Sequence, residues 1–286
     1  DYINTTVGMA TETLHLVEAS MAVPTGYANF VPSAIREVVD LPVVGVGRFK
    51  TPEQAEAALE DGVCDLVGVV RGQIADPDFV NKARAGQSVQ VRTCLSCNQE
   101  CVGRMGLGRW SGCTENPRAG RESVPLPMPR RRGRTVVVVG GGPAGLQAAA
   151  TAAQRGHAVT LFERERRLGG QILTASVVPA RRELADLVRN LESECRRSGV
   201  TIELDAGADL AIVEERAPEV VVIATGARPL RPAWAGRSER VVGVRDVLDG
   251  KILPSGTVLV YDELGFHQGT SVAEFLADRG CAVTIA

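Results

Sequence analysis

Short apolar segments alternate with amphipathic segments along the first ninety residues. Apolar runs predict β-strands at 2–5, 42–46 and 66–70. Apolar positions at helical spacing predict α-helices at 33–39, 52–61 and 78–85, with Thr51-Pro52 and Asp76-Pro77 as start signals. Such alternation is typical of parallel strands covered by helices. Three units cannot close an eight-stranded TIM barrel, which takes roughly 250 residues, but they fit the C-terminal part of one.

A second alternating α/β region begins near Thr135. Strands are predicted at 136–139, 158–163, 200–204, 220–224, 257–262 and 282–286, and helices at 144–155, 181–198 and 272–279. The first strand is an uninterrupted valine run, as expected for a strand buried on both faces of a sheet. We therefore expect a Rossmann-like dinucleotide-binding domain at 134–230 and the start of a further nucleotide-type domain at 231–286.

The segment between these regions, residues 93–133, loses the periodic pattern and is rich in Cys, Gly and Arg. It ends in a Pro-rich stretch at 124–129 and an Arg-rich run at 130–134, which are typical of a linker. No aromatic residues interleave with these arginines, so single-stranded nucleic acid is not an expected partner. Residues 1–92 are assigned to the end of the barrel.

Charge and cysteine content narrow the class of protein. The 286 residues carry a net charge of −2, from 32 basic and 34 acidic residues, which argues against nucleic acid or an anionic membrane as partner. No apolar run reaches the roughly 18–20 residues of a membrane-spanning helix. Seven cysteines, unevenly spread, do not fit a secreted disulfide framework and indicate a reducing, cytoplasmic location. Both ends fall inside predicted strands, so we expect a piece of a longer protein; an oligomer is possible.

Gly140, Gly142 and Gly145 form a G-x-G-x-x-G motif between a predicted strand and a predicted helix. The first glycine would allow the tight turn, the second the approach of a pyrophosphate to the helix N-terminus, and the third close packing of helix on strand. Glu163 ends the next strand, where a carboxylate can accept hydrogen bonds from a ribose. The motif therefore predicts a dinucleotide site.

Two later segments, 169–171 and 224–226, resemble the flavin-contacting segments of two-dinucleotide flavoproteins such as glutathione reductase. This resemblance shifts the expected ligand from NAD to FAD. The residues expected to contact it are Gly170, Gln171, Thr225 and Gly226.

Cys94, Cys97, Cys101 and Cys113 follow the spacing C-x2-C-x3-C-x11-C. Four thiolates in a short, loop-rich segment suit a soft metal or an iron–sulfur cluster. Zinc ribbons usually present two C-x2-C pairs, whereas this segment has one, so a cluster is favoured and structural zinc is the alternative. The isolated cysteines are expected to act as small apolar residues: Cys64, Cys195 and Cys281.

Gly47 and Arg48 follow one predicted barrel strand, and Arg71 closes the next. The loops after the last two strands of TIM barrels frequently bind phosphate. Backbone N–H groups at glycine and bidentate guanidinium donors suit that ligand. The alternative is that these arginines have a structural role at the strand ends.

Several motifs in a fixed order resemble one enzyme family. They are DYIN at 1–4, VGVGR at 44–48, DLVG at 65–68, Arg71 with IADP at 74–77, the four cysteines, ENPRAG at 115–120 and the glycine motif. Together they resemble the iron–sulfur flavoenzymes of the Old Yellow Enzyme group, such as 2,4-dienoyl-CoA reductase and trimethylamine and histamine dehydrogenases. The resemblance covers nearly all of the chain. The resemblance implies an FMN-bearing TIM barrel, a four-iron four-sulfur cluster on the four cysteines, and an FAD domain with an inserted NAD(P)H domain. It also implies that Arg48 and Arg71 contact FMN.

The chain departs from this family pattern in two places. The family's catalytic tyrosine would lie before Asp1, so the catalytic residues are unknown. Where a reductase would carry a Gly-rich turn after 257–262, this chain has Asp262 and Glu263, whose charges would repel a pyrophosphate. That loop is more similar to the amine dehydrogenases, whose corresponding domain does not use NAD(P)H and whose FAD-like site holds ADP. No functional role is assigned to His15, His157 or His267.

The leading hypothesis is an oxidoreductase in which electrons pass from NAD(P)H through FAD, the cluster and FMN to an activated alkene such as an enoyl thioester. The alternative is an amine dehydrogenase that passes electrons from FMN through the cluster to an external carrier, with Glu12 or Glu18 near a cationic substrate. A hypothesis of another class is a non-catalytic electron-transfer or nucleotide-binding module. With neither end domain whole, the chain alone is not expected to turn over substrate.

Overall fold

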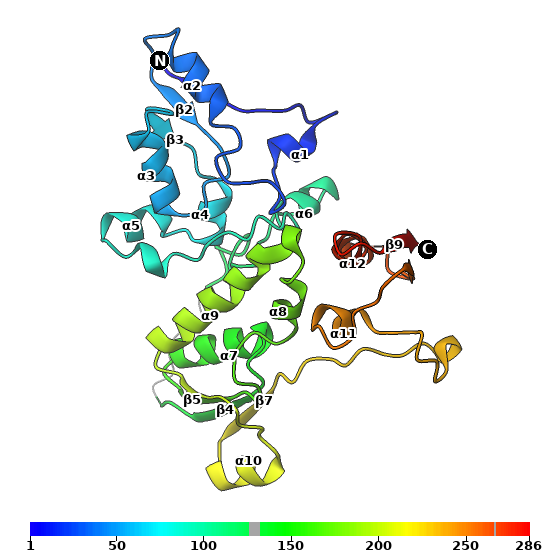
Figure 1. Ribbon diagram of the computed structural model, residues 1–286. Helices are drawn as coiled ribbons and strands as arrows, with labels where there is room; N and C mark the ends of the chain where they lie inside the picture. The colour runs from blue at the N-terminus through cyan, green and yellow to red at the C-terminus, as the bar shows by residue number, and fades with distance from the viewer. Residues whose placement is uncertain (126–131, 266) are drawn as a thin grey trace. The chain divides into compact units, whose positions relative to one another are not determined.

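The computed structural model describes residues 1–125, 132–265 and 267–286, and the chain divides into two compact units (Figure 1). The first unit comprises Asp1–Pro129 together with Arg189–Glu194, and the second comprises Arg130–Val188 and Cys195–Ala286. Most of the linker predicted at 124–134 lies outside the described residues.

The first unit contains a three-stranded parallel sheet with the strand order β1-β2-β3. Its strands are β1 (Ile3–Asn4), β2 (Val43–Gly45) and β3 (Leu66–Val67). Ile3 pairs with Val43, and Val44 pairs with Leu66. All three predicted strands are present, although each is shorter than its apolar run. Consecutive parallel strands in sequential order are the arrangement of neighbouring strands in a TIM barrel.

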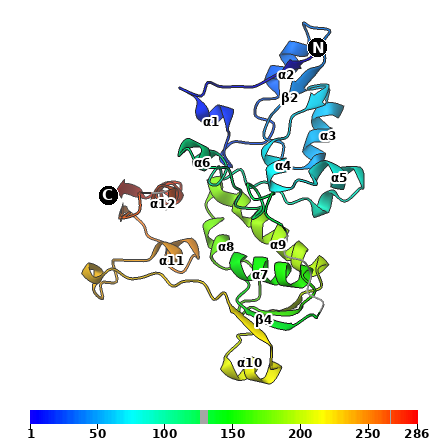
Figure 2. The same cartoon turned by 180° about the vertical axis from the view of Figure 1, so that it is seen from behind.

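Short helices connect and follow these strands. They are α1 (Leu14–Val17), α2 (Phe30–Arg36), α3 (Pro52–Glu60), α4 (Arg71–Ala75), α5 (Phe79–Arg84) and the 3-10 helix η1 (Ser88–Gln90). Helix α2 packs against β2, and α3 packs against both β3 and α5 (Figure 2). Helix α3 starts as predicted, because the Thr51 hydroxyl accepts the N–H of Gln54 at 3.3 Å and Pro52 occupies the first turn.

Of two local predictions in this unit, the one for Asp76 is confirmed and the one for Arg71 is wrong. The Asp76 carboxylate accepts the N–H of Asp78 at 3.1 Å just before α5, and it also accepts the N–H of Arg92 at 2.8 Å and pairs with Lys82 at 2.6 Å. Arg71 does not close a strand, since β3 already ends at Val67 and Arg71 is the first residue of α4. Helix α4 has five residues, which is too short to show a helical period in the sequence.

The cysteine segment of the first unit is irregular apart from α6 (Val102–Gly106). Part of a longer helix, α9 (Ala185–Arg197), holds it through buried polar contacts. Asn190 donates from Nδ2 to the Glu115 carboxylate at 2.7 Å and to the Thr93 carbonyl at 3.3 Å. Arg189 donates to the Thr93 hydroxyl at 2.6 Å. Because Glu115 and Asn190 are both buried, these bonds fix the segment more firmly than surface contacts would.

The second unit contains a four-stranded parallel sheet with the order β6-β5-β4-β7. Its strands are β4 (Thr135–Val139), β5 (Ala158–Phe162), β6 (Thr201–Glu203) and β7 (Val220–Ile223). Val136 of β4 pairs with Val159 on one side and with Val220 on the other. The first strand is central and successive strands are added outward from it, which is the strand order of a Rossmann half.

Helix α7 (Pro143–Gln154) covers β4 and β5, and its buried face meets the valine-rich strand (Figure 1). The other helices are α8 (Gln171–Ala175), η2 (Pro179–Leu184) and α10 (Leu210–Arg216). The single helix predicted at 181–198 is divided, because its first residues belong to η2 and α9 begins only at Ala185. Cys195 is fully buried and contacts the Leu146 carbonyl, as expected for a small core residue.

A separate βαβ element ends the second unit, as the sequence predicts. It consists of β8 (Thr257–Val260), α12 (His267–Ala277) and β9 (Ala282–Ile285), and the two strands are parallel. The 3-10 helix η3 (Ala233–Ala235) and helix α11 (Val244–Leu248) precede it. Phe275 and Leu276 of α12 pack with Val247 and Val260 in one hydrophobic core.

We expect Gly145→Ala to destabilise the second unit by about 1–3 kcal/mol or more, because the added Cβ would lie 1.8 Å from the Gly140 carbonyl oxygen. Gly142→Ala is the matched control, since a Cβ there has no atom within 4 Å and removes only a glycine N-cap. Urea unfolding at neutral pH measures both variants. Equal stability of the two would contradict the close helix–strand packing.

Candidate cofactor sites

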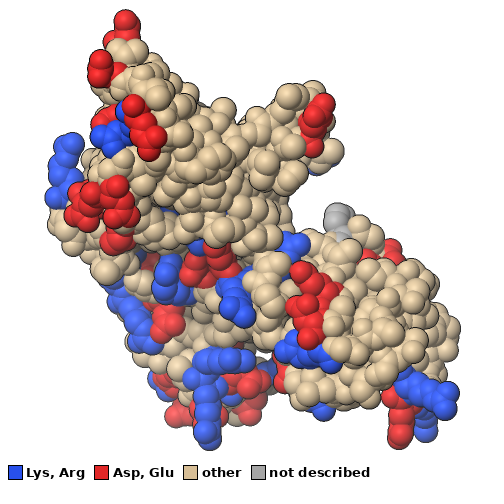
Figure 3. Space-filling model, turned by 45° about the horizontal axis from the view of Figure 1, so that its top comes forward, with Lys and Arg blue, Asp and Glu red and all other residues tan. Residues whose placement is uncertain are grey.

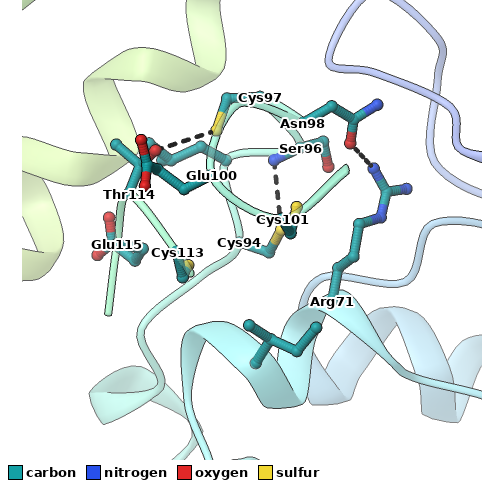
Figure 4. A pocket seen from close by; sticks show the side chains of 12 residues that line it. Arg71, Cys94, Ser96, Cys97, Asn98, Glu100, Cys101, Cys113, Thr114 and Glu115 are labelled. Carbon is teal, nitrogen blue, oxygen red and sulfur yellow. Dashed lines mark hydrogen bonds between the residues drawn. The ribbon is translucent and has the colours of Figure 1, made fainter. Parts of the chain in front are cut away.

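Four cysteine side chains line one pocket of the first unit (Figure 4). The pocket encloses about 330 Å³ of space, part of it open to solvent, and its wall also includes Arg71, Ser96 and Glu115. The chain turns sharply between the first cysteines, because Ser96 and Asn98 both adopt left-handed backbone conformations with φ of 49° and 57°. The structure thus brings together all four predicted ligands: Cys94, Cys97, Cys101 and Cys113.

Three of these thiols, those of Cys94, Cys101 and Cys113, have a raised pKa. Burial raises the pKa of Cys94 and Cys101, and neighbouring thiolates would raise it further. Burial also raises the pKa of Cys113 to about 11. Two features oppose this effect at Cys94, namely the N–H of Ser96, which donates to its Sγ at 3.3 Å, and the positive charge of Arg71. The pocket is therefore suited to a cationic centre that displaces the thiol protons.

The four cysteines surround a shared space, with Cys97 and Cys113 on different sides of it (Figure 4). Within residues 1–125, 132–265 and 267–286, no three His, Cys, Asp or Glu side chains form a ready-made site for a single metal ion. Thiolate ligands suit both an iron–sulfur cluster and structural zinc.

Tyr27 lies within the electrostatic reach of the two strand-end arginines of the first unit. Gly47 and Arg48 follow β2, and the Gly47 carbonyl accepts the N–H of Gly26 at 2.6 Å. Burial raises the pKa of Tyr27, whereas the charges of Arg71 and Arg48 both oppose that shift. Guanidinium groups of this kind suit a phosphate ligand.

Arg71 also belongs to the wall of the cysteine pocket. Its Nη1 donates to the Ala19 carbonyl at 2.8 Å and to the Asn98 side-chain oxygen at 2.5 Å (Figure 4). Asn98 in turn donates to the Glu18 carbonyl at 2.6 Å. One arginine therefore connects the strand-end site to the turn that carries the cysteines. Of the two carboxylates considered near a substrate, Glu12 is exposed, whereas Glu18 is partly buried in this network.

The glycine motif of the second unit has the geometry predicted for each position. Gly140 has φ of 110°, and a Cβ there would lie 2.4 Å from the Ala224 carbonyl oxygen. Gly145 packs directly on the Gly140 carbonyl, whereas Gly142 faces open space at the start of α7. A phosphate could approach the helix N-terminus at Gly142, where a side chain would otherwise project.

The segments at 169–171 and 224–227 converge on this motif. A Cβ on Gly170 would lie 3.6 Å from the Gly142 Cα, and one on Gly140 would lie 3.2 Å from the Thr225 nitrogen. Gln171 donates from Nε2 to the Ala227 carbonyl at 2.6 Å, and Gly226 lies beside that same amide group. The structure therefore brings together the residues expected to contact a dinucleotide.

Glu163 follows β5 and is only 7% exposed. Its carboxylate accepts the N–H of Gly141 at 2.7 Å and the N–H of Glu165 at 2.9 Å. These bonds hold the carboxylate against the glycine loop. Each of its oxygens keeps a further lone pair that a ribose hydroxyl could use.

The loop after β8 places carboxylates at the N-terminus of α12. Asp262 accepts the N–H of Leu264 at 2.9 Å, and its other oxygen lies 2.5 Å from where a Cβ on Gly269 would be. A hydrogen bond to Glu263 raises the pKa of Tyr261. Since a nucleotide pyrophosphate binds at this kind of helix N-terminus, the Asp262 carboxylate stands where that anion would bind.

The positions of the three histidines leave the predicted ligand and cofactor residues unchanged. His157 accepts the N–H of Arg134 at 3.1 Å and so has a structural contact. Burial and the nearby charge of Arg181 lower the pKa of His267. His15 is exposed on α1.

Two family models match the two α/β regions of the chain. The model of the NADH:flavin oxidoreductase / NADH oxidase family matches residues 3–90, and that of the pyridine nucleotide-disulphide oxidoreductases matches residues 134–258. The chain belongs to the Old Yellow Enzyme group of flavin oxidoreductases. Its first unit contains a short C-terminal segment of the TIM barrel and its second a Rossmann-like domain, as the sequence predicts. Membership of this group implies the flavin cofactors FMN and FAD.

Relatives within the Old Yellow Enzyme group carry different names. Bilirubin reductase of Mediterraneibacter gnavus is 39% identical over 88% of this chain, and N,N-dimethylglycine/sarcosine dehydrogenase of Chromohalobacter salexigens is 37% identical over 96%. The structure of 6-hydroxypseudooxynicotine amine oxidase from Pseudomonas geniculata aligns with a TM-score of 0.91 and 29% identity, over 99% of this chain and 44% of that one. The chain spans 39% and 41% of the length of the two curated relatives.

In the described part of the chain, no helix is long and apolar enough to cross a membrane. On the face drawn in Figure 3, basic and acidic side chains lie close to one another, and the described residues of that face form no broad basic area. A net charge near zero fits small-molecule chemistry better than nucleic-acid binding.

Sequence reasoning missed Tyr27, Ser96 and Asn98. An asparagine beside a cysteine could have been suspected, because Asn tolerates left-handed backbone at turns. Ser96 gave no such signal, since serine has no preference for that conformation. Tyr27 lies outside every motif, and its position between Arg48 and Arg71 is visible only in the folded chain.

We expect the metal-free, reduced protein to lose stability as the pH rises from about 9 to about 11. The folded-state pKa of Cys113 is about 11, above the ordinary thiol value, so the unfolded chain releases its proton first and the folded state is penalised at high pH. Below the unfolded pKa both states keep the proton, and no penalty exists. Urea unfolding at several pH values measures this loss. Cys113→Ala should reduce it, and the same pH dependence in that variant would contradict the buried thiol.

Proposed function

We propose that the protein is a flavin- and iron–sulfur-dependent oxidoreductase that removes electrons from a small amine and delivers them to an external carrier. The observation that carries the proposal is the pocket of four thiols joined through Arg71 to the strand-end site of the first unit. When bound, the flavins would supply hydride chemistry and the cluster would carry single electrons.

The first unit would hold two of these groups. Cys94, Cys97, Cys101 and Cys113 would ligate a four-iron four-sulfur cluster, which their spacing in the sequence and their shared pocket support. Gly47, Arg48 and Arg71 would contact the phosphate or ring of FMN at the ends of β2 and β3. Arg71 would then neutralise negative charge at both groups.

The second unit would hold FAD, or its ADP half, on the glycine motif. Gly140, Gly142 and Gly145 would cradle the pyrophosphate, and Glu163 would accept from the ribose. The flanking contacts would come from Gly170, Gln171, Thr225 and Gly226. We retain the division 1–92, 93–133, 134–230 and 231–286 as part of this proposal.

The direction of electron flow is supported by the loop after β8. Asp262 lies against Gly269 at the start of α12 and would repel the pyrophosphate of NAD(P)H. This favours an enzyme that receives its electrons at the FMN end, and the name of the dimethylglycine/sarcosine dehydrogenase relative agrees with an amine as donor. Glu18 would be the carboxylate that attracts a cationic substrate, since one of its carboxylate oxygens is buried and hydrogen-bonded to none of the described residues.

Reduction of an activated alkene with NAD(P)H is the second candidate. The relative named bilirubin reductase, at 39% identity, supports it. In that case electrons would travel in the opposite direction through the same residues, and the substrate would be a conjugated alkene such as an enoyl thioester.

In a protein that carries this chain together with a complete barrel, we expect anaerobic addition of N-methylated amines to bleach the flavin absorbance within seconds, whereas NADH and NADPH at equal concentration bleach it at least tenfold more slowly. Stopped-flow absorbance measures both rates. Rapid bleaching by NAD(P)H and none by amines would favour the second candidate. A colourless protein would support a non-catalytic nucleotide-binding module instead.

We expect Cys97→Ser to lower the iron and acid-labile sulfide content to less than a quarter of the wild-type value, because one of four thiolate ligands is lost. Cys64→Ser is the matched control, since Cys64 is buried in a separate core with Phe49 and Ala58. It should retain wild-type iron. Stoichiometric zinc without iron after anaerobic purification would contradict the cluster.

A further inference from the structure

Ser96 is an unusual residue in the wall of the cysteine pocket. It lies between Cys94 and Cys97, is 1% exposed, and has a left-handed backbone with φ of 49°. Its main chain is fully used, because the N–H donates to the Cys94 sulfur and the carbonyl accepts the N–H of Met21 at 2.9 Å. Its hydroxyl, by contrast, is buried and hydrogen-bonded to none of the described residues.

This placement carries two costs that glycine would avoid. A non-glycine residue held in the left-handed region costs of the order of 1 kcal/mol or more. A buried hydroxyl without a partner costs about a further 1–3 kcal/mol. The turn itself needs only the backbone of residue 96, so the hydroxyl contributes nothing to holding the turn. A buried polar group with no protein partner, in a pocket built for a ligand, indicates that the ligand is its partner.

The chemistry of the pocket identifies the kind of partner. A hydroxyl can donate one hydrogen bond, and the acceptors that a cluster would bring here are sulfur atoms, either inorganic sulfide or ligating thiolate. Arg71 and the N–H of Ser96 already direct positive charge and a donor into the same pocket. A third donor would extend this electropositive lining.

We propose that the Ser96 hydroxyl donates a hydrogen bond to a sulfur atom of the bound iron–sulfur cluster and so stabilises its reduced form. The inference rests on the proposed function, since it requires a cluster in the pocket. One-electron reduction adds negative charge to the sulfur atoms, and a hydrogen bond to a charged acceptor is stronger than one to a neutral acceptor. Ser96 would change the reduction potential of the cluster without ligating it, and the four cysteines remain the ligands.

The test compares Ser96→Ala and Ser96→Gly with the wild-type protein, all purified without oxygen. Both variants lack the hydroxyl, and the glycine variant also relieves the left-handed strain, so a folding defect cannot explain a shared change. We expect the equilibrium constant for one-electron reduction of the cluster to fall about tenfold in both, which is a potential about 59 mV lower. Redox titration followed by electron paramagnetic resonance measures it.

A control and a direct readout accompany the titration. Ser20→Ala removes a hydroxyl that accepts the N–H of Ala22 outside the pocket wall, so the potential should stay at the wild-type value. Electron–nuclear double resonance in H2O and D2O should show one exchangeable-proton coupling of the reduced cluster in the wild type that both Ser96 variants lack.

The outcomes separate this inference from the function on which it rests. Wild-type protein without iron and sulfide would overturn the proposed cluster. Wild-type protein with a cluster, together with Ser96 variants of unchanged potential and unchanged proton couplings, would overturn the hydrogen bond alone. A lowered potential in both Ser96 variants with an unchanged Ser20→Ala control would support it.

Discussion

Gathering four thiols in one pocket is the constraint on which the first unit depends. Desolvation raises the pKa of Cys94, Cys101 and Cys113, so these side chains stay protonated at neutral pH and bring no charge that would order the segment. The surrounding chain supplies the order instead. Asn190 and Arg189 bind the segment at Thr93 and Glu115, and Arg71 binds its turn at Asn98. A cationic centre would complete this arrangement by displacing the thiol protons.

Arg71 makes the strand-end site and the cysteine pocket parts of one electrostatic environment. Its guanidinium affects the ionisation of Tyr27 at the strand ends and of Cys94 in the pocket. The same fixed positive charge therefore favours the anionic form of a group at either site. In a protein that moves electrons between two groups, such a residue would stabilise added negative charge at both.

Much of the fold could be predicted from the sequence, because valine runs, glycine spacing and the Thr51-Pro52 start signal act locally. The convergence of 169–171 and 224–227 on Gly142 follows from strand order, and the motif resemblance anticipated it. Arg71 shows the limit, because its place at the start of α4 and its bond to Asn98 depend on tertiary contacts that the sequence pattern does not reveal. Ser96 could not be predicted, since its conformation opposes its own preference.

The Asp262 carboxylate, held against Gly269 at the start of α12, has a wider consequence. A carboxylate fixed to the chain stays beside the helix N-terminus at any concentration of dissolved anion. An anion that approached this end of α12 would therefore always meet a like charge. In this way one side chain could change the ligand preference of a βαβ element while the strands, the helix and the core stay the same.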